Sequence, residues 1–138
     1  MAAEAEVTWV AERRFIGHAA SGHGIVVDGS ADKLGPSPME LVLIGLAGCT
    51  AYDVLDILEK KKQAVTGLRV RAHAERAPEA PRVYTAIAVE FVVTGRDIRD
   101  KAVEDAIQLS MCKYCSVAQM LRSTAEINTS YRIEESTV

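Results

Sequence analysis

Three cysteines are the residues in this sequence best suited to chemistry, and their surroundings differ. Cys49 stands alone inside a long apolar stretch, whereas Cys112 and Cys115 form a C-x-x-C pair near the C-terminus. A cysteine thiolate can attack an electrophile or bind a metal, but a free cysteine is more often a small, buried core residue. Gly48 and Ala51 flank Cys49 and leave room beside its sulfur, which favours a reactive thiol at this position.

The same cysteines fit a metal site or a thioredoxin-type site poorly. A structural zinc ion needs four ligands, usually from two paired motifs. Beyond the cysteines, the chain offers only three scattered histidines: His18, His23 and His73. A thioredoxin-type C-x-x-C opens a helix directly after a parallel strand, whereas this pair follows a predicted helix. We therefore expect no bound metal.

Glu40, Arg13 and Arg14 are charged residues with both a structural and a functional interpretation. Glu40 completes Ser37-Pro38-Met39-Glu40, a capping box with proline at the first helical position, so it could serve the helix start alone. Arg13 and Arg14 lie on a predicted strand and could form part of its solvated face. Either arginine could instead supply the positive charge that a thiolate at Cys49 requires.

The capping box opens the clearest predicted helix, which should run from Ser37 to about Lys62 and carry Cys49 near its centre. From Leu41 to Tyr52 this helix is apolar on every side. A helix that is apolar all round must be covered all round, and a chain of 138 residues has too few strands to do so alone. We therefore expect a second copy of the chain to cover it.

Strands and shorter helices make up the rest of the chain. Alternation of apolar and polar residues predicts strands, and apolar residues three and four apart predict helices. The expected elements are a strand from Val7 to Phe15, a turn at 17–22, strands at 23–27, 68–75 and 83–93, a helix capped by Asp97 or Asp100 and ending near Cys112, a short helix at 117–121 and a strand at 127–133. This pattern indicates an α+β fold with mainly antiparallel sheet, in one domain spanning residues 1–138.

Composition excludes several classes of protein. The 16 basic and 19 acidic side chains give a net charge of −3, which argues against nucleic-acid binding. The N-terminus has no basic start followed by an apolar stretch, so it predicts no secretory signal. The longest nearly apolar run, 41–52, is shorter than the roughly 20 residues that span a bilayer. An odd number of cysteines does not suit a secreted disulfide framework, and we expect a soluble cytoplasmic protein.

Two segments of the chain form a recognisable combination: GPSPMELVLIGLAGCT at residues 35–50, and Lys113-Tyr114-Cys115-Ser116-Val117. Together they resemble the OsmC/Ohr family of osmotically inducible and organic hydroperoxide resistance proteins. A Pro-x-Glu-Leu helix start, a mid-helix cysteine and a late second cysteine form a fairly specific combination. The resemblance covers nearly the whole chain, and the late Tyr-Cys-Ser-Val is most similar to a less characterised OsmC-like branch.

The resemblance implies a cysteine-based thiol peroxidase. By position, Cys49 matches the peroxidatic cysteine, whose thiolate attacks the peroxide O–O bond, and Cys115 matches the resolving cysteine that then forms a disulfide with it. An external dithiol would reduce that disulfide, and no metal or organic cofactor would take part. The family fold is an intertwined α+β homodimer with a long, buried central helix and with active sites at its interface.

One departure from the family pattern bears on activity. Peroxidase members carry a Glu directly after the helix-opening Pro, paired with an Arg, where this chain has Met39 and then Glu40. One residue turns a side chain by about 100° around a helix, so Glu40 faces a different direction from the family's Glu. Arg13 and Arg14 are the candidates for the arginine partner.

The leading hypothesis is reduction of organic hydroperoxides, with hydrogen peroxide as a further candidate. The alternative is a dimeric binding module for a small apolar ligand or electrophile with little turnover, favoured by Met39 and the apolar Leu43, Leu46 and Met120.

The expected position in a helix favours Cys115 over Cys112 as the cysteine that resolves Cys49. Cys112 is expected at the C-terminal end of a helix, where the partial charge is negative and disfavours a thiolate. Cys115 is expected at the start of the next helix, where free backbone N–H groups favour a thiolate. We therefore predict that Cys115 has the lower pKa and resolves Cys49, and that Cys112 is a packed apolar thiol.

Overall fold

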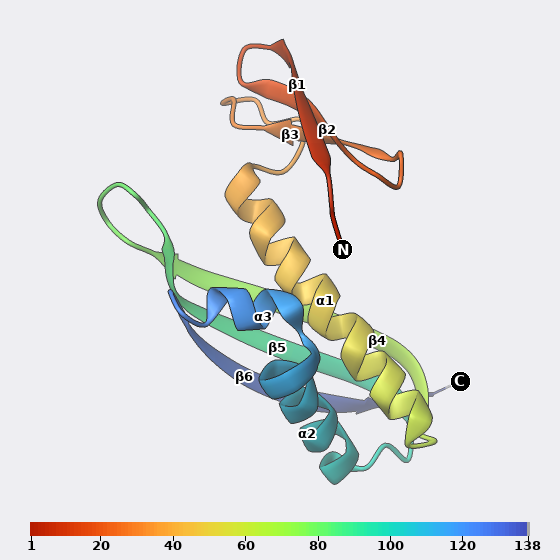
Figure 1. The fold of residues 1–138 in the computed structure, drawn as a ribbon. Coiled ribbons are helices and arrows are strands. Elements are labelled where there is room, and N and C mark those ends of the chain that lie inside the picture. Colours follow the sequence, from red (N-terminus) through yellow and green to blue (C-terminus); the bar gives the residue numbers. More distant parts are fainter. Residues whose placement is uncertain (138) are drawn as a thin grey trace. The chain divides into compact units, whose positions relative to one another are not determined.

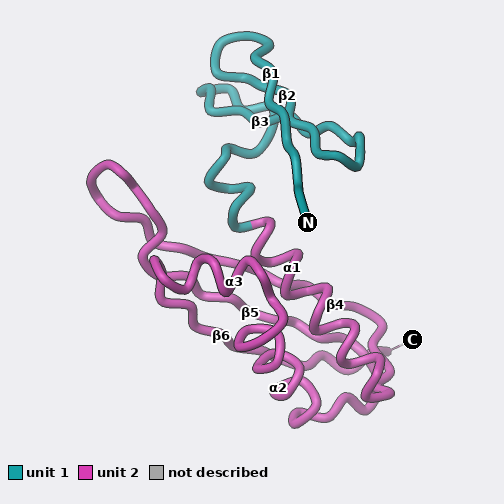
Figure 2. Tube along the Cα trace, viewed as in Figure 1, with its two compact units in different colours: residues 1–43 teal, residues 44–138 magenta. Residues whose placement is uncertain are grey.

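The structure is a computed structural model that describes residues 1–137, and the chain forms two compact units, Met1–Leu43 and Ile44–Val138 (Figure 2). Each unit has a three-stranded sheet of its own, β1–β3 in the first and β4–β6 in the second (Figure 1). Helix α1 (Pro38–Lys60) begins in the first unit and lies mostly in the second. Strands and segregated helices confirm the predicted α+β class, whereas the single domain over 1–138 stays a prediction.

The first unit is an antiparallel sheet of β1 (Ala5–Ala11), β2 (Arg14–Ala19) and β3 (Gly24–Asp28). The predicted single strand from Val7 to Phe15 is wrong, because the chain reverses at Glu12, which has a positive φ of 48°. The predicted turn at 17–22 begins too early. Gly17 lies inside β2, where it is buried and pairs with Val7 and Ile25.

Helix α1 starts with the predicted capping box. The Glu40 backbone N–H donates to Ser37 Oγ at 3.2 Å, and the Ser37 backbone N–H donates to Glu40 Oε1 at 2.9 Å. Pro38 occupies the first helical position, where a backbone N–H would have no partner within the helix. The helix ends at Lys60, close to the predicted end at Lys62.

One stripe of α1 is buried in the chain: Leu46, Thr50, Val54 and Leu58. Ile44 and Tyr52 on other sides of the helix are 57% and 78% exposed. By length and composition alone α1 is apolar enough to cross a membrane, with a mean hydropathy of 1.8 over 18 residues. In Figure 1 the part of α1 within the second unit lies across one face of the sheet, and 22% of the 18-residue window is buried inside the chain.

The second unit has the sheet order β4 (Ala64–Arg76), β5 (Tyr84–Arg96) and β6 (Glu126–Glu135). Most pairings in the chain are antiparallel, as predicted, but β6 runs parallel to β5 because helices connect the two strands. The register places Val70, Phe91 and Tyr131 in one row across the three strands. Phe91 has no exposed surface, and its face of β5 forms the core beneath the helices (Figure 1).

Between β5 and β6 the chain forms α2 (Asp100–Leu109), a π-helical turn η1 (Ser110–Tyr114) and α3 (Ser116–Leu121). The predicted aspartate cap of this first helix is wrong, since Arg99 is the N-cap of α2 and makes no side-chain capping hydrogen bond. Asp100 lies in the first turn, and its carboxylate instead accepts a hydrogen bond from Tyr131 Oη at 2.9 Å. Of the C-x-x-C pair, Cys112 therefore lies in the π-helical turn and Cys115 lies directly after it.

Candidate active site

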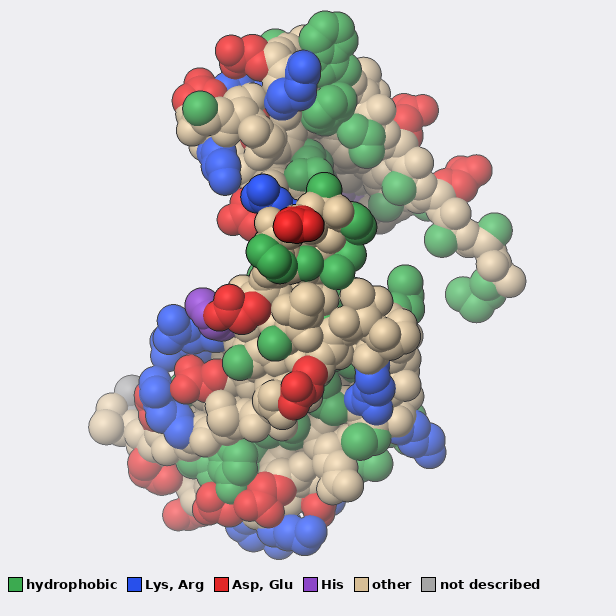
Figure 3. Space-filling view, turned by 90° about the vertical axis from the view of Figure 1, so that its left-hand side faces the viewer, with side chains coloured by type: hydrophobic (Ala, Val, Ile, Leu, Met, Phe, Trp, Pro, Cys, Tyr) green, Lys and Arg blue, Asp and Glu red, His purple; other side chains and the backbone are tan. Residues whose placement is uncertain are grey.

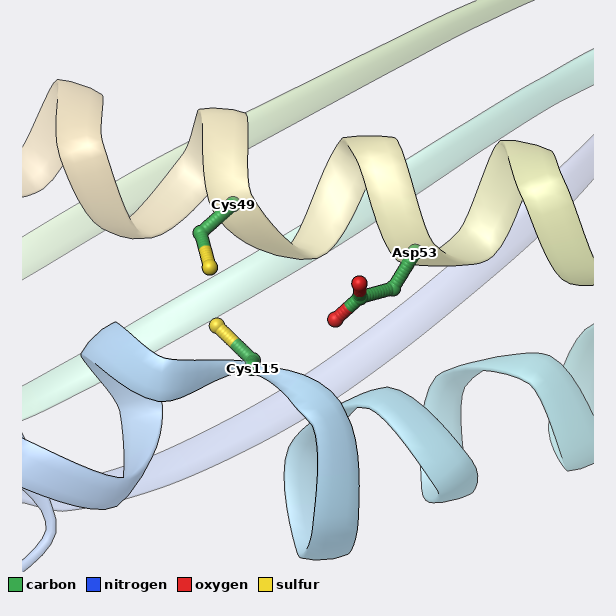
Figure 4. A group of neighbouring side chains, drawn as sticks. All are labelled: Cys49, Asp53 and Cys115. Atoms are coloured by element: carbon green, nitrogen blue, oxygen red, sulfur yellow. The ribbon is translucent and has the colours of Figure 1, made fainter. Parts of the chain in front are cut away.

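Two cysteines and one aspartate meet in the second unit (Figure 4). The Sγ atoms of Cys49 and Cys115 and a carboxylate oxygen of Asp53 all lie within 4.8 Å of one another. The sequence pattern indicated both cysteines as site residues but not Asp53. A spacing of four residues from Cys49 within a helix is the signal that could have found it, because residues i and i+4 share a helix face.

The π-helical turn η1 positions Cys115. The Cys115 backbone N–H closes the turn by donating to the Ser110 carbonyl oxygen at 2.7 Å. Cys115 is also the N-cap of α3, where the Ala118 backbone N–H donates to Cys115 Sγ at 3.4 Å. Cys115 has no exposed surface, whereas Cys49 is half-buried. The buried sulfur is thus held by backbone contacts beside a sulfur that solvent partly reaches.

The pKa of the Cys115 thiol is raised to about 11, opposite to the lowered pKa that its helix position predicts. Burial is the main cause, because it disfavours the charged thiolate. The Ala118 N–H does lower the pKa, as expected at a helix start, but Cys49 and the negative charge of Asp53 raise it further. Cys115 is therefore a thiol at neutral pH, and its proton must pass to an acceptor when its sulfur attacks.

Two buried hydroxyl groups fix the position of Asp53. Ser110 Oγ donates to Asp53 Oδ2 at 2.9 Å and lies 2.7 Å from Thr50 Oγ1. A hydroxyl has one proton to donate, so Thr50 is the donor in its bond with Ser110. Thr50 and Ser110 have no exposed surface. The Asp53 carboxylate on α1 is therefore held by Ser110, the first residue of η1, and Thr50 of α1 holds Ser110 in turn.

Cys112 lies outside this group of side chains. Its side chain is exposed, so the prediction of a packed apolar thiol is wrong. It lines a pocket of about 370 Å³ with Met111, Arg122 and Tyr131, among others. The assignment of Cys115 as the resolving cysteine stays a prediction, and its position beside Cys49 supports it.

Arg14 belongs to a cluster of charges in the first unit. Its guanidinium pairs with Asp28 at 2.7 Å and with Asp32 at 2.6 Å. Asp28 has no exposed surface. The Leu34 backbone N–H, and after it the Arg14 guanidinium, hold the pKa of Asp28 well below its usual range. Arg14 thus keeps a buried carboxylate ionised in the strand and loop region of this unit.

Arg13 and Glu40 also have local partners in the first unit. The Arg13 guanidinium donates to the Glu12 carbonyl oxygen at 2.9 Å. The Glu40 carboxylate takes part in the capping box, and the hydrogen bond from the Ser37 backbone lowers the pKa of Glu40. The structural interpretation of Glu40 is therefore met, and a role for Glu40 or either arginine at Cys49 stays a prediction.

Among residues 1–137, the same three side chains, Cys49, Asp53 and Cys115, form the group that could hold a metal ion. Two sulfur atoms and one oxygen atom supply three ligands, whereas a closed structural zinc site has four. A thiophilic ion at this place would occupy both sulfurs and block their chemistry. The expectation of no bound metal stays a prediction.

Comparison with known proteins adds the family context. Residues 29–130 match the family model described as OsmC-like protein. The chain is 48% identical over 130 residues to Protein YhfA of Escherichia coli K12, across 94% of this chain and 97% of that protein. Its fold is similar to a hypothetical protein from Aquifex aeolicus VF5, with a TM-score of 0.89, 29% identity, and 99% and 98% of the two chains covered. It is also similar to the organic hydroperoxide resistance protein OhrB of Bacillus subtilis, with a TM-score of 0.66, 12% identity, and 96% and 98% covered.

Proposed function

The chain belongs to the OsmC-like protein family, and from this we propose that it is a thiol-dependent peroxidase of organic hydroperoxides, with hydrogen peroxide as a further candidate substrate. The observation that carries the proposal is the placement of the Cys49 and Cys115 sulfurs within 4.8 Å of each other. Relatives of the same fold include proteins named for organic hydroperoxide resistance. A half-buried thiol beside a fully buried one suits a nucleophile with a protected partner.

The proposed cycle uses sulfur chemistry alone, with no metal or organic cofactor. The Cys49 thiolate attacks the O–O bond, which breaks. One oxygen stays on Cys49 as a sulfenic acid, and the other leaves as an alkoxide, which takes up the proton released when the Cys49 thiol ionised and becomes an alcohol. Cys115 then attacks the sulfenic sulfur, so that an S–S bond forms, the S–O bond breaks and water leaves. An external dithiol reduces the disulfide and restores both thiols.

A cation near Cys49 would raise its thiolate fraction. The only basic residue in α1 is Lys60, in the last turn. We assign the role to Arg13 or Arg14, from the same chain or from a second copy. Replacing Arg14 would also leave the buried Asp28 without its ion-pair partner, so Arg13→Ala is the cleaner variant. It should slow peroxide consumption about tenfold if Arg13 is the activating residue, and Arg13→Lys should restore most of the rate.

We propose that the protein is an obligate homodimer with the active sites at its interface. Large apolar side chains of α1 lie open to solvent, with Ile44 57%, Tyr52 78% and Leu55 38% exposed. Hydrophobic side chains lie at the surface of each unit in Figure 3. An obligate interface would bury more than roughly 2,000 Å². Light scattering at micromolar concentration should give twice the chain mass of 14.9 kDa, and a monomer mass would refute the proposal.

The proposed surroundings are the cytoplasm, where thiols are kept reduced and dithiol reductants are present. The fold and the family suit a soluble protein. The net charge of −3 gives no general attraction to nucleic acid, so the proposed partners are a second copy of the chain, a hydroperoxide and a dithiol.

A second candidate function is binding of a small apolar ligand or electrophile with little turnover. A mainly apolar pocket of about 460 Å³ lies along α1, with Ala51, Tyr52, Leu55 and Leu68 in its lining. The predicted apolar wall of Leu43, Leu46 and Met120 does not form this pocket, since Leu46 is fully buried and Met120 is 75% exposed.

Consumption of cumene hydroperoxide in the presence of a dithiol separates the two functions. A peroxidase should turn over many equivalents of peroxide, and Cys49→Ser should lose that turnover. A binding module should show saturable binding of an apolar fluorescent probe, unchanged in Cys49→Ser, without catalytic loss of peroxide. Wild-type protein that consumes no more than one equivalent would contradict the peroxidase proposal.

A further inference from the structure

We propose that Asp53 is the proton acceptor for Cys115 when Cys115 attacks Cys49, an inference that rests on the proposed peroxidase function. Asp53 lies one helical turn after Cys49 on α1, and its carboxylate lies within 4.8 Å of both sulfurs (Figure 4). No feature of the sequence motif shared with the family includes this residue, so the assignment comes from the geometry.

The placement of the Asp53 carboxylate suits proton transfer. Ser110 Oγ donates to Asp53 Oδ2 at 2.9 Å, and Thr50 supports Ser110 from the same helix as Asp53. A carboxylate offers two oxygens and about four lone-pair sites, so the bond from Ser110 leaves capacity for a proton from Cys115. The two hydroxyls therefore orient the carboxylate without saturating it.

Asp53 also joins the buried thiol to solvent. Cys115 has no exposed surface of its own. Asp53 lines an open pocket of about 430 Å³ together with Asp56, Lys60 and Tyr114, among others. Two basic side chains of the same pocket, Lys60 and Lys61, face other aspartates, Asp56 at 3.0 Å and Asp105 at 3.8 Å respectively. A proton taken up by Asp53 can thus exchange with water in the pocket.

The proposed step balances atoms, electrons and protons. The Cys115 S–H bond breaks and its proton moves to the Asp53 carboxylate as the Cys115 sulfur attacks Cys49. The S–S bond forms and the S–O bond of the sulfenic acid breaks. Asp53 then gives the proton to the leaving hydroxide, which departs as water. The Cys49 sulfur is reduced by one electron equivalent and the Cys115 sulfur is oxidised by one.

A purely electrostatic role for Asp53 predicts the opposite effect of its removal. The negative charge of Asp53 is one cause of the raised pKa of Cys115. If Asp53 acted only through that charge, Asp53→Asn would favour the Cys115 thiolate and speed disulfide formation. If Asp53 accepts the proton, Asp53→Asn slows the same step, so the sign of the change decides between the two roles.

The first test measures the two steps separately after one addition of cumene hydroperoxide, in the Cys112→Ser background. A sulfenic-acid trap and mass spectrometry follow Cys49 oxidation, and peptide mapping follows the Cys49–Cys115 disulfide. Asp53→Asn should form the sulfenic acid within about twofold of the parent rate but form the disulfide about a hundredfold more slowly at pH 7. The slow rate should rise with pH, because hydroxide then removes the Cys115 proton. Disulfide formation at the parent rate or faster would overturn the proposal.

Two variants control for charge and for folding. Glu59→Gln makes the same change in charge on the same helix, at an exposed residue that does not line this pocket, and should leave both steps within about twofold of the parent rates. Asp53→Glu keeps a carboxylate and should recover part of the disulfide rate. A rate loss in Glu59→Gln equal to that in Asp53→Asn would assign the effect to net charge rather than to proton transfer.

A second test needs no peroxide. In the Cys112→Ser background, an aromatic disulfide reagent converts Cys49 into a mixed disulfide and releases one coloured thiolate. Cys115 then displaces a second. Asp53→Asn should slow only this second release, and an unchanged second release would overturn the proposal. If wild-type protein forms no sulfenic acid with peroxide, the peroxidase proposal fails while this test still decides the role of Asp53.

Discussion

Two aspartates, Asp28 in the first unit and Asp53 in the second, show how surroundings divide one residue type between structure and chemistry. Asp28 is fully buried and accepts hydrogen bonds from two backbone N–H groups and from Arg14. Asp53 is half-buried, accepts a hydrogen bond from the Ser110 hydroxyl and lies beside two sulfurs. A carboxylate surrounded by donors keeps its charge, whereas a carboxylate next to a thiol is placed to take a proton from it.

The largest expected effect tests whether the second unit carries the chemistry at all. Cys49→Ser should reduce peroxide consumption to the uncatalysed rate, because a serine hydroxyl cannot replace the thiolate as nucleophile. Thermal unfolding should change little, since serine and cysteine are similar in size. The measurement is cumene hydroperoxide loss with dithiol in excess. Full activity in Cys49→Ser would show that Cys49 is not the nucleophile and that the second unit is not the region that carries the chemistry.

The next effect sharpens the contrast within the second unit, between its two later cysteines. Cys115→Ser should lower turnover at least about tenfold and prolong the Cys49 sulfenic acid, because the buried partner of Cys49 is lost. Cys112→Ser should keep turnover within about twofold, since Cys112 lies outside the group. Peptide mapping of the oxidised protein checks both. A Cys49–Cys112 or Cys112–Cys115 bond as the main product would contradict the assignment.

A smaller effect tests the structural side of the comparison. Asp28→Asn should lower Tm by about 5 °C or more, because the amide cannot replace the charge that Arg14 and the backbone N–H groups surround. The pKa of Asp28 is lower in the folded than in the unfolded protein, so its contribution is complete above about pH 4 and is lost as pH falls. The free energy of unfolding of Asp28→Asn should therefore depend less on pH than that of the parent protein between about pH 4 and pH 2. An unchanged Tm would show that Asp28 is not structural.

The smallest effect concerns Glu40, the residue with two interpretations. Glu40→Gln should leave Tm within a degree or two, because glutamine can also accept the Ser37 N–H in a capping box. Peroxide consumption should stay within about twofold if the cap is the whole role of Glu40. Loss of activity at an unchanged Tm would instead show that Glu40 takes part in peroxide reduction as well as in the helix cap.

Short stretches of sequence were enough to predict those helices and strands that depend on residues close together in the chain. The capping box at Ser37, the helix that carries Cys49 and the alternation along β5 are all visible in short windows of sequence. The hairpin between β1 and β2 was missed because it depends on the positive φ of Glu12, a residue that gives no turn signal of its own. Parallel pairing of β6 with β5 depends on the path of two intervening helices, which no window contains.

The site shows the same limit for contacts and for electrostatics. Ser110 and Asp53 are 57 residues apart in sequence, so their hydrogen bond follows only from packing of the helices. Helix position correctly indicated an N–H donor for Cys115, which is Ala118. The direction of its pKa was nevertheless wrong, because burial outweighs that donor and burial of a single side chain is not visible in the sequence.

The π-helical turn makes the cysteine pair sensitive to a kind of genetic change that residue substitution does not mimic. The Cys115 N–H bonds to the carbonyl of Ser110, five residues back, where an α-helix would bond four residues back. Deleting the codon of Lys113 or Tyr114 would restore the α-helical period and turn the following residue by about 100° relative to α2. Both cysteines would still be encoded, yet Cys115 would no longer face Cys49. Insertions and deletions at residues 113 and 114 should therefore be tolerated less well than substitutions at the same two exposed residues.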